Sequence, residues 1–227
     1  MVERTELIKE VTDSVIKVLS AYGIEISTDQ HQTDIPISVS ARHLHLSPEH
    51  VEYLFGKGYQ LTPFKEISQP HQYACKEQVT ISGPKGQIER VRVLGPSRGK
   101  TQVEVSKTDA RVLGLQPPVR SSGDLADSSP VTITGPTGTV LKLSEGCIIA
   151  DRHIHMTPAD AAHYGVKDGD RTDVAIDGDK PGILKNVAIR VKDTYALDMH
   201  VDTDDGNAFL IEGSGRVRLL KKEEQQL

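Results

Sequence analysis

The sequence contains the pattern His-(apolar)-His twice, each time after an arginine and shortly before a Ser-Pro or Thr-Pro dipeptide. His43 and His45 lie in "SARHLHLSP", and His153 and His155 lie in "ADRHIHMTP" in the second half of the chain. Alternate side chains of a β-strand project from the same face, so each pair would present two imidazoles side by side. Two imidazoles on one face form a bidentate clip for a transition metal. The repeat therefore predicts two metal-binding strands.

A later segment of each copy supplies a third candidate ligand. Aligning "QVEVSKTDA" with "DMHVDTDDG" places Glu104 opposite His200, and both side chains can bind metals. Three protein ligands leave coordination positions open for water or substrate, which is typical of catalytic metal sites. Imidazole and carboxylate suit zinc, and cobalt, nickel or iron fit the same ligands. One histidine pair alone is weak evidence, but its duplication with equivalent third residues predicts two bound divalent metal ions.

Short runs of β-branched and other apolar residues, separated by Gly-Pro turns, dominate the chain from residue 35 onward. Such runs predict strands, and the two that carry the histidine pairs, "IPISVSARHLHLS" and "CIIADRHIH", are each predicted as a strand. Ser47-Pro48 and Thr157-Pro158 then supply the N-cap and the first-turn proline of short helices. The first copy is longer, which indicates an insertion near residues 59–78. Many short strands and few helices predict a mainly β fold of small barrels or sandwiches.

Residues 2–22 carry apolar side chains on one helical face and charged side chains on the other, which predicts an amphipathic helix. The helix ends at Gly23, and a polar linker follows. Such a helix either docks on the core of its own domain or binds a partner through its apolar stripe. The pattern favours neither alternative.

Composition excludes several classes of partner. The chain has 227 residues and a net charge of −5, without a basic stripe, so nucleic acid is not an expected partner. No apolar run approaches the roughly 18 residues that a membrane span needs. The N-terminus lacks the apolar stretch of a secretory signal. Cys75 and Cys147 form no disulfide framework, and we expect two buried, unreactive thiols in an intracellular protein.

Arg98 is the candidate for anion binding. It lies in "LGPSRGKTQVEV", which resembles a Walker loop but is one residue too short and leads into a strand rather than a helix. Its planar guanidinium could still present a fork to a phosphate near the proposed ligand Glu104. From spacing alone, a solvated hairpin tip is the better interpretation of this turn.

Four segments together resemble the PduL-type phosphotransacylases, also called phosphate propanoyltransferases: "SARHLHLSPE", "GPSRGKTQVEVS", "ADRHIHMTPAD" and "DMHVDTDDGNA". The resemblance runs from about Ile35 to Leu220. It implies two similar six-stranded β-barrels with short helices, beside the N-terminal amphipathic helix. Residues 35–42 and 151–221 would form one barrel, and residues 43–150, with the insertion, the other. A dinuclear metal site, usually zinc, would lie between them.

The resemblance also implies a role for each candidate residue. His43, His45 and Glu104 would bind one metal ion, and His153, His155 and His200 the other. Arg98 would bind phosphate, which overrides the interpretation as a hairpin tip. The implied reaction converts a short acyl-CoA, propanoyl-CoA or acetyl-CoA, and phosphate into acyl phosphate and CoA by direct phosphate attack.

Residues 1–34 resemble the encapsulation peptides that direct such enzymes into bacterial microcompartments. We therefore expect the microcompartment lumen or the cytoplasm as the location, and shell or cargo proteins as partners of residues 1–22. We also expect a homo-oligomer. Two alternatives to the transferase remain: a dinuclear metallohydrolase acting on a thioester or phosphoester, and a non-catalytic, metal-binding component of a microcompartment.

Overall fold

The computed structural model describes residues 34–211 and 214–220, together with Val15 and Val18. The chain divides into two compact units, Met1–Asp34 and Ile35–Leu227. The predicted helix over residues 2–22 lies outside the described residues, except that Val15 and Val18 are helical and exposed. None of the helices in the described part of the chain has the length and apolar character that a membrane crossing requires.

Six strands from the two ends of the second unit form a closed barrel, here called the C-terminal barrel. In order around the barrel they are β1 (Asp34–Ser40), β13 (Asp198–Asp202), β10 (His153–Met156), β12 (Gly182–Val191), β11 (Arg171–Ile176) and β14 (Ser214–Leu219). β1 pairs in parallel with β13, and β13 pairs antiparallel with β10. The first strand of the unit therefore belongs with strands that come much later in the chain.

The segment between them forms a second ring of six strands, here called the middle barrel. Its order is β4 (Tyr73–Ser82), β5 (Gln87–Gly95), β2 (His43–His45), β6 (Gln102–Glu104), β9 (Val140–Ala150) and β8 (Ser129–Thr134). The ring closes because β8 pairs with both β9 and β4. β3 (Pro63–Glu66) adds to the edge of β4, and β7 (Val119–Arg120) pairs with β9. The prediction of a mainly β fold with two six-stranded barrels is confirmed.

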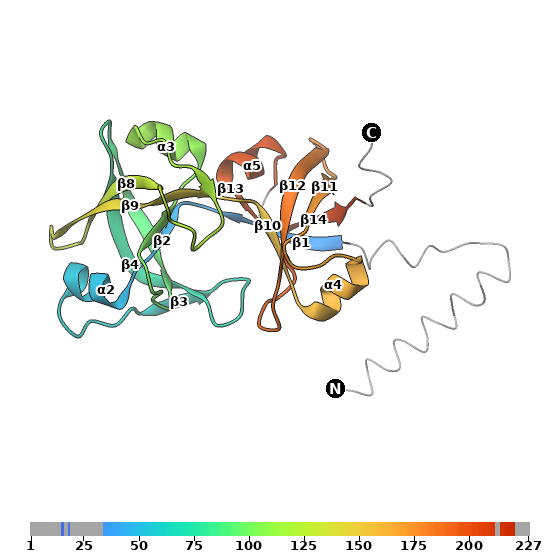
Figure 1. Ribbon diagram of the computed structural model, residues 1–227, viewed down its shortest axis with the longest axis horizontal. Helices are drawn as coiled ribbons and strands as arrows, with labels where there is room; N and C mark the ends of the chain where they lie inside the picture. The colour runs from blue at the N-terminus through green and yellow to red at the C-terminus, as the bar shows by residue number, and fades with distance from the viewer. Residues whose placement is uncertain (1–14, 16–17, 19–33, 212–213, 221–227) are drawn as a thin grey trace. The chain divides into compact units, whose positions relative to one another are not determined.

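The structure divides each histidine-bearing run that the sequence predicts as one strand. β1 ends at Ser40 and β2 begins at His43, and β9 ends at Ala150 and β10 begins at His153. At both breaks the chain leaves one barrel and enters the other (Figure 1). The apolar pattern continues across each break because both flanking segments are strands, so the change of pairing partners leaves no local signal. The two crossings bring the histidine pairs to the place where the barrels meet.

The apolar residue between the histidines fixes the direction of each pair. Leu44 and Ile154 are fully buried and belong to the cores of the middle and C-terminal barrels, respectively. Full burial of such a side chain contributes about 1.5–3 kcal/mol. Because neighbouring strand residues point to opposite faces, burying the central residue turns both histidines away from the core. The cores thereby orient the imidazoles.

A short helix follows each strand that carries candidate ligands. They are α2 (Pro48–Phe55), α3 (Lys107–Leu113), α4 (Pro158–Tyr164) and α5 (Thr203–Ala208). Ser47 caps α2 and Thr157 caps α4, each followed by the predicted proline. Each side-chain oxygen accepts a backbone N–H of the first turn, which replaces a missing helical bond. The duplication is therefore one of whole strand–helix units.

The insertion near residues 59–78 crosses between the barrels. Gln69, which is 2% exposed, donates from Nε2 to the carbonyl oxygen of Ala196 at 3.0 Å. The backbone N–H of Ala196 donates to Gln69 Oε1 at 3.2 Å. One side chain from the middle segment thus satisfies both backbone groups of a residue just before β13.

The two cysteines lie in the core cluster of the middle barrel as free, buried residues. Burial raises the pKa of Cys75 and of Cys147 to about 12. Both thiols are therefore protonated at neutral pH, as expected for unreactive core residues.

Candidate functional site

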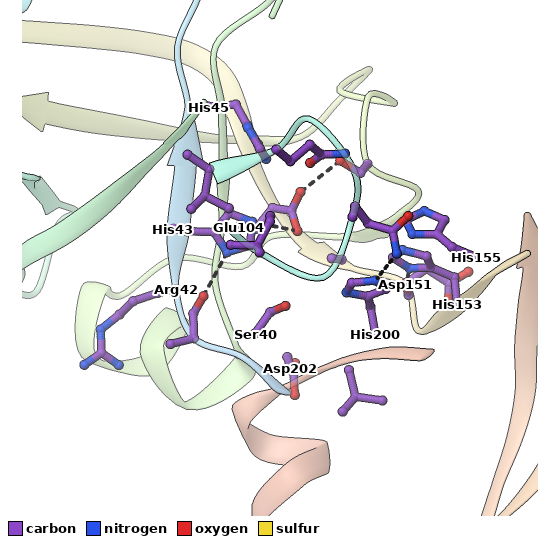
Figure 2. Close-up of a pocket in the computed structure, with 18 of the residues that line it drawn as sticks. Ser40, Arg42, His43, His45, Glu104, Asp151, His153, His155, His200 and Asp202 are labelled. Carbon is purple, nitrogen blue, oxygen red and sulfur yellow. Dashed lines mark hydrogen bonds and ion pairs between the residues drawn. The ribbon is translucent and has the colours of Figure 1, made fainter. Parts of the chain in front are cut away.

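One cavity of about 240 Å³ brings together all the residues that the sequence singled out for chemistry. Figure 2 shows the first candidate ligand set on one side of this cavity and the second on the other. The seven residues are His43, His45, Arg98, Glu104, His153, His155 and His200. They come from four strands and one turn of the two barrels.

Strand register places the two sets in equivalent ways. β2 and β6 are antiparallel, with His43 opposite Glu104. β10 and β13 are also antiparallel, with His153 opposite His200. Directly opposite residues project to the same face, so each strand pair presents its candidate ligands together. The sequence alignment that matched Glu104 with His200 therefore corresponds to an equivalence in space.

The first set is compact. The candidate donor atoms of His43, His45 and Glu104 all lie within 4.8 Å of one another. His43 Nε2 is 3.4 Å from Glu104 Oε2, and its Nδ1 is 2.8 Å from the carbonyl oxygen of Ala41. A proton on Nδ1 would donate to that carbonyl, which leaves Nε2 with a free lone pair toward the carboxylate. This arrangement could hold a metal ion.

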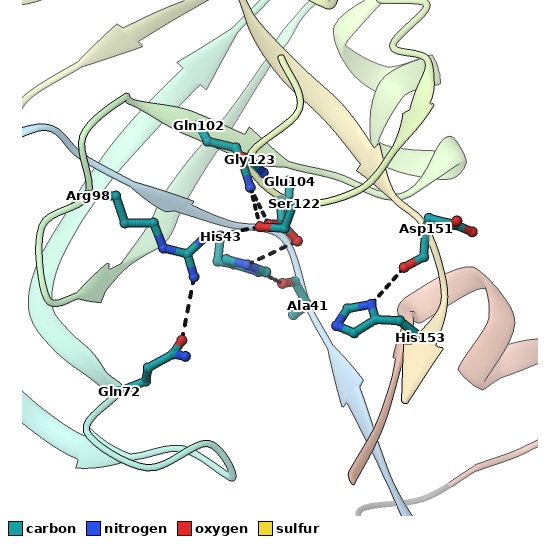
Figure 3. Close-up of polar contacts among 10 residues, drawn as sticks. All are labelled: Ala41, His43, Gln72, Arg98, Gln102, Glu104, Ser122, Gly123, Asp151 and His153. Atoms are coloured by element: carbon teal, nitrogen blue, oxygen red, sulfur yellow. Dashed lines mark hydrogen bonds and ion pairs between the residues drawn. The ribbon is translucent and has the colours of Figure 1, made fainter. Parts of the chain in front are cut away.

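The second set repeats the backbone contact. His153 Nδ1 is 2.8 Å from the carbonyl oxygen of Asp151, so the residue two positions earlier orients the ring as in the first set (Figure 3). The ring centroids of His153 and His155 are 4.6 Å apart, and those of His155 and His200 are 4.9 Å apart. Within the described part of the chain, only the first set has all its donor atoms within 4.8 Å of one another. In the second set, His200 Nε2 faces Asp198 Oδ2 at 3.4 Å.

The imidazoles of the second set are held in the neutral form. Burial, and then the positive charge of Arg190, lowers the pKa of His153 to about 3. Burial, and then the charge of His153, lowers the pKa of His155 to about 2. Burial also lowers the pKa of His200. Neutral imidazole is the form that binds metals, so these residues are prepared for coordination without losing a proton.

In the first set, burial and the neighbouring charges shift the pKa values in different directions. Burial, and then the charge of Arg98, lowers the pKa of His45 to about 3. Burial alone would also lower the pKa of His43 and raise that of Glu104. Their mutual charge and hydrogen bond reverse both effects, so the pKa of His43 lies above its ordinary value and that of Glu104 below it. A proton between His43 Nε2 and Glu104 Oε2 would occupy a place where a divalent cation could serve the same electrostatic role.

Arg98 reaches the cavity from the turn between β5 and β6. Its Nη1 donates to Ser122 Oγ at 3.0 Å, and its backbone N–H donates to the carbonyl oxygen of Leu46 at 2.9 Å. Ser122 Oγ in turn donates to Glu104 Oε1 at 2.9 Å (Figure 3). The guanidinium is thereby fixed beside the first ligand set.

The arginines that precede the histidine pairs do not enter either set. Arg42 pairs with Asp109 at 2.8 Å, and Arg152 pairs with Asp205 at 3.2 Å. Each carboxylate belongs to the helix that follows the third ligand strand of its own repeat. These ion pairs connect the segments that cross between the barrels, residues 41–42 and 151–152, to helices α3 and α5. They thereby stabilise the chain where each strand is interrupted.

Three residues near the ligand sets escaped the sequence analysis. Asp198 lies two positions before His200 on the same face of β13, as Gln102 lies before Glu104 on β6, so strand alternation could have indicated it. Arg190 lines the cavity from β12, and Ser122 lines it from the segment after β7. Their contribution depends on strand pairing and on a loop path, which no local pattern encodes.

The chain is similar in sequence to proteins of one family. The sequence model of the family described as phosphate propanoyltransferase matches residues 36–212. A phosphate propanoyltransferase of Thermotoga maritima is 52% identical over 203 residues, covering 88% of this chain and 94% of that protein. One of Priestia megaterium is 49% identical over 222 residues, covering 98% and 99%, respectively. One of Alkaliphilus metalliredigens is 47% identical over 206 residues, covering 90% and 93%.

Proposed function

The chain belongs to the phosphate propanoyltransferase family of acyltransferases, and we propose that it carries out phosphotransacylation at a site that holds two divalent metal ions. The substrates are a short acyl-CoA and inorganic phosphate, with propanoyl-CoA as the first candidate and acetyl-CoA as the second. The observation that carries the proposal is the single cavity onto which two equivalent ligand sets and Arg98 open.

The donor types of both sets suit divalent ions, and the donor atoms of the first set also lie within 4.8 Å of one another. Burial lowers the pKa of His45 and of His153, which favours their neutral forms, and His43 Nε2 lies 3.4 Å from Glu104 Oε2, so one cation could contact both atoms. His43, His45 and Glu104 would hold one ion, and His153, His155 and His200 the other. Zinc is the first candidate because imidazole and carboxylate suit it. When bound, such ions polarise an acyl carbonyl and stabilise a thiolate leaving group.

Arg98 binds and orients phosphate in this proposal. One phosphate oxygen forms the new bond to the acyl carbon, the carbon–sulfur bond breaks, and its electron pair leaves with the CoA thiolate. Holding phosphate beside the thioester replaces a bimolecular encounter by a positioned one. Positive charge fixed in advance also stabilises the oxyanion that develops on the acyl group.

The chain does not need to supply a nucleophile for this route. Cys75 and Cys147 are protonated core residues of the middle barrel and do not line the cavity. Phosphate is itself a competent nucleophile once it is oriented, so a covalent acyl-enzyme is not required. Direct attack is therefore the simplest mechanism.

The test follows the release of free thiol from propanoyl-CoA and from acetyl-CoA, with and without phosphate. We expect release that requires phosphate and that His153→Ala abolishes. His163→Ala, which changes an exposed histidine on α4 of the same barrel, is the matched control and should behave like the wild type. Release without phosphate would instead support the metallohydrolase, and no release from metal-loaded protein would support a binding role.

A further inference from the structure

Arg190 occupies a special position among the strands of the C-terminal barrel. β12 pairs in parallel with β10, and Arg190 lies at the level of His155. The corresponding pair in the middle barrel is β5 with β2, where Leu94 lies at the level of His45. Both Arg190 and Leu94 line the cavity. At this equivalent position, the middle barrel therefore has the apolar Leu94 and the C-terminal barrel has the guanidinium of Arg190.

The guanidinium of Arg190 has an unused donor. Its Nη2 is buried and has no hydrogen-bond partner among the described residues. The nearby carboxylate of Asp151 is already paired with Arg171 at 2.6 Å. A buried donor without a partner costs free energy, and the cost is larger when the group is charged. Such a group is expected where a ligand supplies the missing acceptor.

Two guanidiniums thus act on one cavity from opposite halves. Arg98 lines the cavity from the turn before β6, and Arg190 lines it from β12, at the level of His155. The carboxylate of Glu104, which also lines the cavity, is already engaged by His43 and Ser122. Among the described residues, neither Arg98 nor Arg190 is paired with a carboxylate, whereas Arg42, the third arginine of the lining, pairs with Asp109. A small polyanion could therefore pair with both guanidiniums.

We propose that Arg190 is a second anion-binding residue, which together with Arg98 holds the phosphoryl group of inorganic phosphate and of the acyl phosphate product. The inference rests on the proposed phosphotransacylase reaction. A phosphoryl group offers several oxygens, so two planar forks can engage it from different sides. The phosphates of CoA are separated from its thioester by the pantetheine arm, whereas Arg190 lies beside the histidines at the reacting centre. The inorganic phosphate is therefore the matching anion.

The test separates the two substrates. Arg190→Leu places in β12 the side chain that β5 carries at the equivalent position, and Arg190→Lys keeps the charge without the fork. Losing a charge-assisted hydrogen bond should raise the KM for phosphate about 10- to 100-fold in Arg190→Leu. The KM for propanoyl-CoA should change by less than about 3-fold. Arg216→Leu, which removes an exposed arginine of β14 in the same barrel, should change neither value.

The same variants are compared by calorimetric titration with inorganic phosphate, which needs no turnover. We expect weaker phosphate binding in Arg190→Leu and an intermediate value in Arg190→Lys. A raised KM for propanoyl-CoA with unchanged phosphate binding would overturn the proposal, and so would unchanged values for both. If Arg190→Leu does not fold, Arg190→Lys decides through its KM for phosphate. If the wild type binds phosphate but transfers no acyl group, the proposed phosphotransacylase reaction is contradicted, whereas the proposed phosphate site is retained.

Discussion

Arg98 and Glu104 are joined through one hydroxyl, that of Ser122. The hydroxyl accepts a hydrogen bond from Arg98 Nη1 at 3.0 Å and donates one to Glu104 Oε1 at 2.9 Å. It also accepts from Gln102 Nε2 at 2.8 Å. Arg98, which we propose binds phosphate, and Glu104, which we propose binds metal, therefore share Ser122 as a positioning residue. A change at Ser122 should affect the positions of both side chains.

Ser122→Ala tests this link. Removing a hydroxyl that bonds two charged groups costs about 1.5–3 kcal/mol for each charge-assisted bond, although part of the loss is recovered from water. We expect the KM for phosphate to rise about 10-fold and the metal affinity of the first set to fall, while the fold is retained. Steady-state kinetics and metal titration measure the two effects. Ser121→Ala, an exposed neighbour, is the control. Unchanged phosphate KM would show that Arg98 is positioned by its other contacts.

The two ligand sets predict a specific metal content. His45→Ala removes one donor from the first set and His155→Ala removes one from the second, and both residues are nearly fully buried. We expect each variant to retain about one metal ion per chain, whereas the wild type retains about two, because each set is independent in its ligands. Elemental analysis after desalting measures this ratio. Loss of both ions from either variant would mean that the sets do not bind separately.

Asp198→Asn tests the carboxylate behind the second set. Asp198 is 3% exposed, both its carboxylate oxygens are buried without a hydrogen-bond partner among the described residues, and Oδ2 is 3.4 Å from His200 Nε2. A carboxylate in this position can orient a metal-binding imidazole, and losing such a group typically weakens metal binding about 10- to 100-fold. Competition with a chelator, compared with the exposed control Asp193→Asn, measures the change. Equal affinities in the two variants would exclude this role.

Much of the site follows from the sequence because it depends on strand alternation. Burying Leu44 and Ile154 turns each histidine pair outward, and the duplication locates Glu104 and His200. The caps Ser47 and Thr157 likewise follow from local hydrogen-bonding chemistry.

The remaining features depend on which strands pair, and this is not written in any local pattern. Arg190 faces the cavity only because β12 lies beside β10. Gln69 meets Ala196 only because the insertion crosses to the other barrel. The breaks after Ser40 and Ala150 interrupt runs that remain strand-like on both sides, so alternation alone predicts continuous strands.

Acid should destabilise the metal-free protein. The pKa of His155 is about 2 in the folded protein, against an ordinary value of 6.5, and those of His45 and His153 are about 3. As the pH falls below about 6.5, the unfolded chain binds these protons while the folded protein does not, so stability decreases until the folded groups titrate. Each such histidine contributes up to about 1.4 kcal/mol per pH unit. His43, whose pKa is raised, acts in the opposite direction and offsets part of this loss.

Denaturant unfolding of chelator-treated protein at about pH 7, 6 and 5 measures this dependence. Since other groups also titrate in this range, His155→Leu provides the specific comparison. Its slope of stability against pH should be smaller than that of the wild type by about one proton. Identical slopes would show that His155 is protonated equally in the folded and unfolded states.

Removing residues 1–22 separates the two interpretations of the N-terminal helix. Among the described residues, both core clusters consist of residues from Ile35 onward. If residues 1–22 bind a microcompartment shell or cargo protein, the truncated chain should keep its kcat/KM and a Tm within about 2 °C of the full chain. The same residues fused to a fluorescent protein should then direct it to microcompartments in a host that makes them. A full chain with Val15→Asp and Val18→Asp, which keeps the length but interrupts the apolar stripe, should fail to localise. A Tm lowered by more than about 5 °C on truncation would instead show that the helix docks on its own domain.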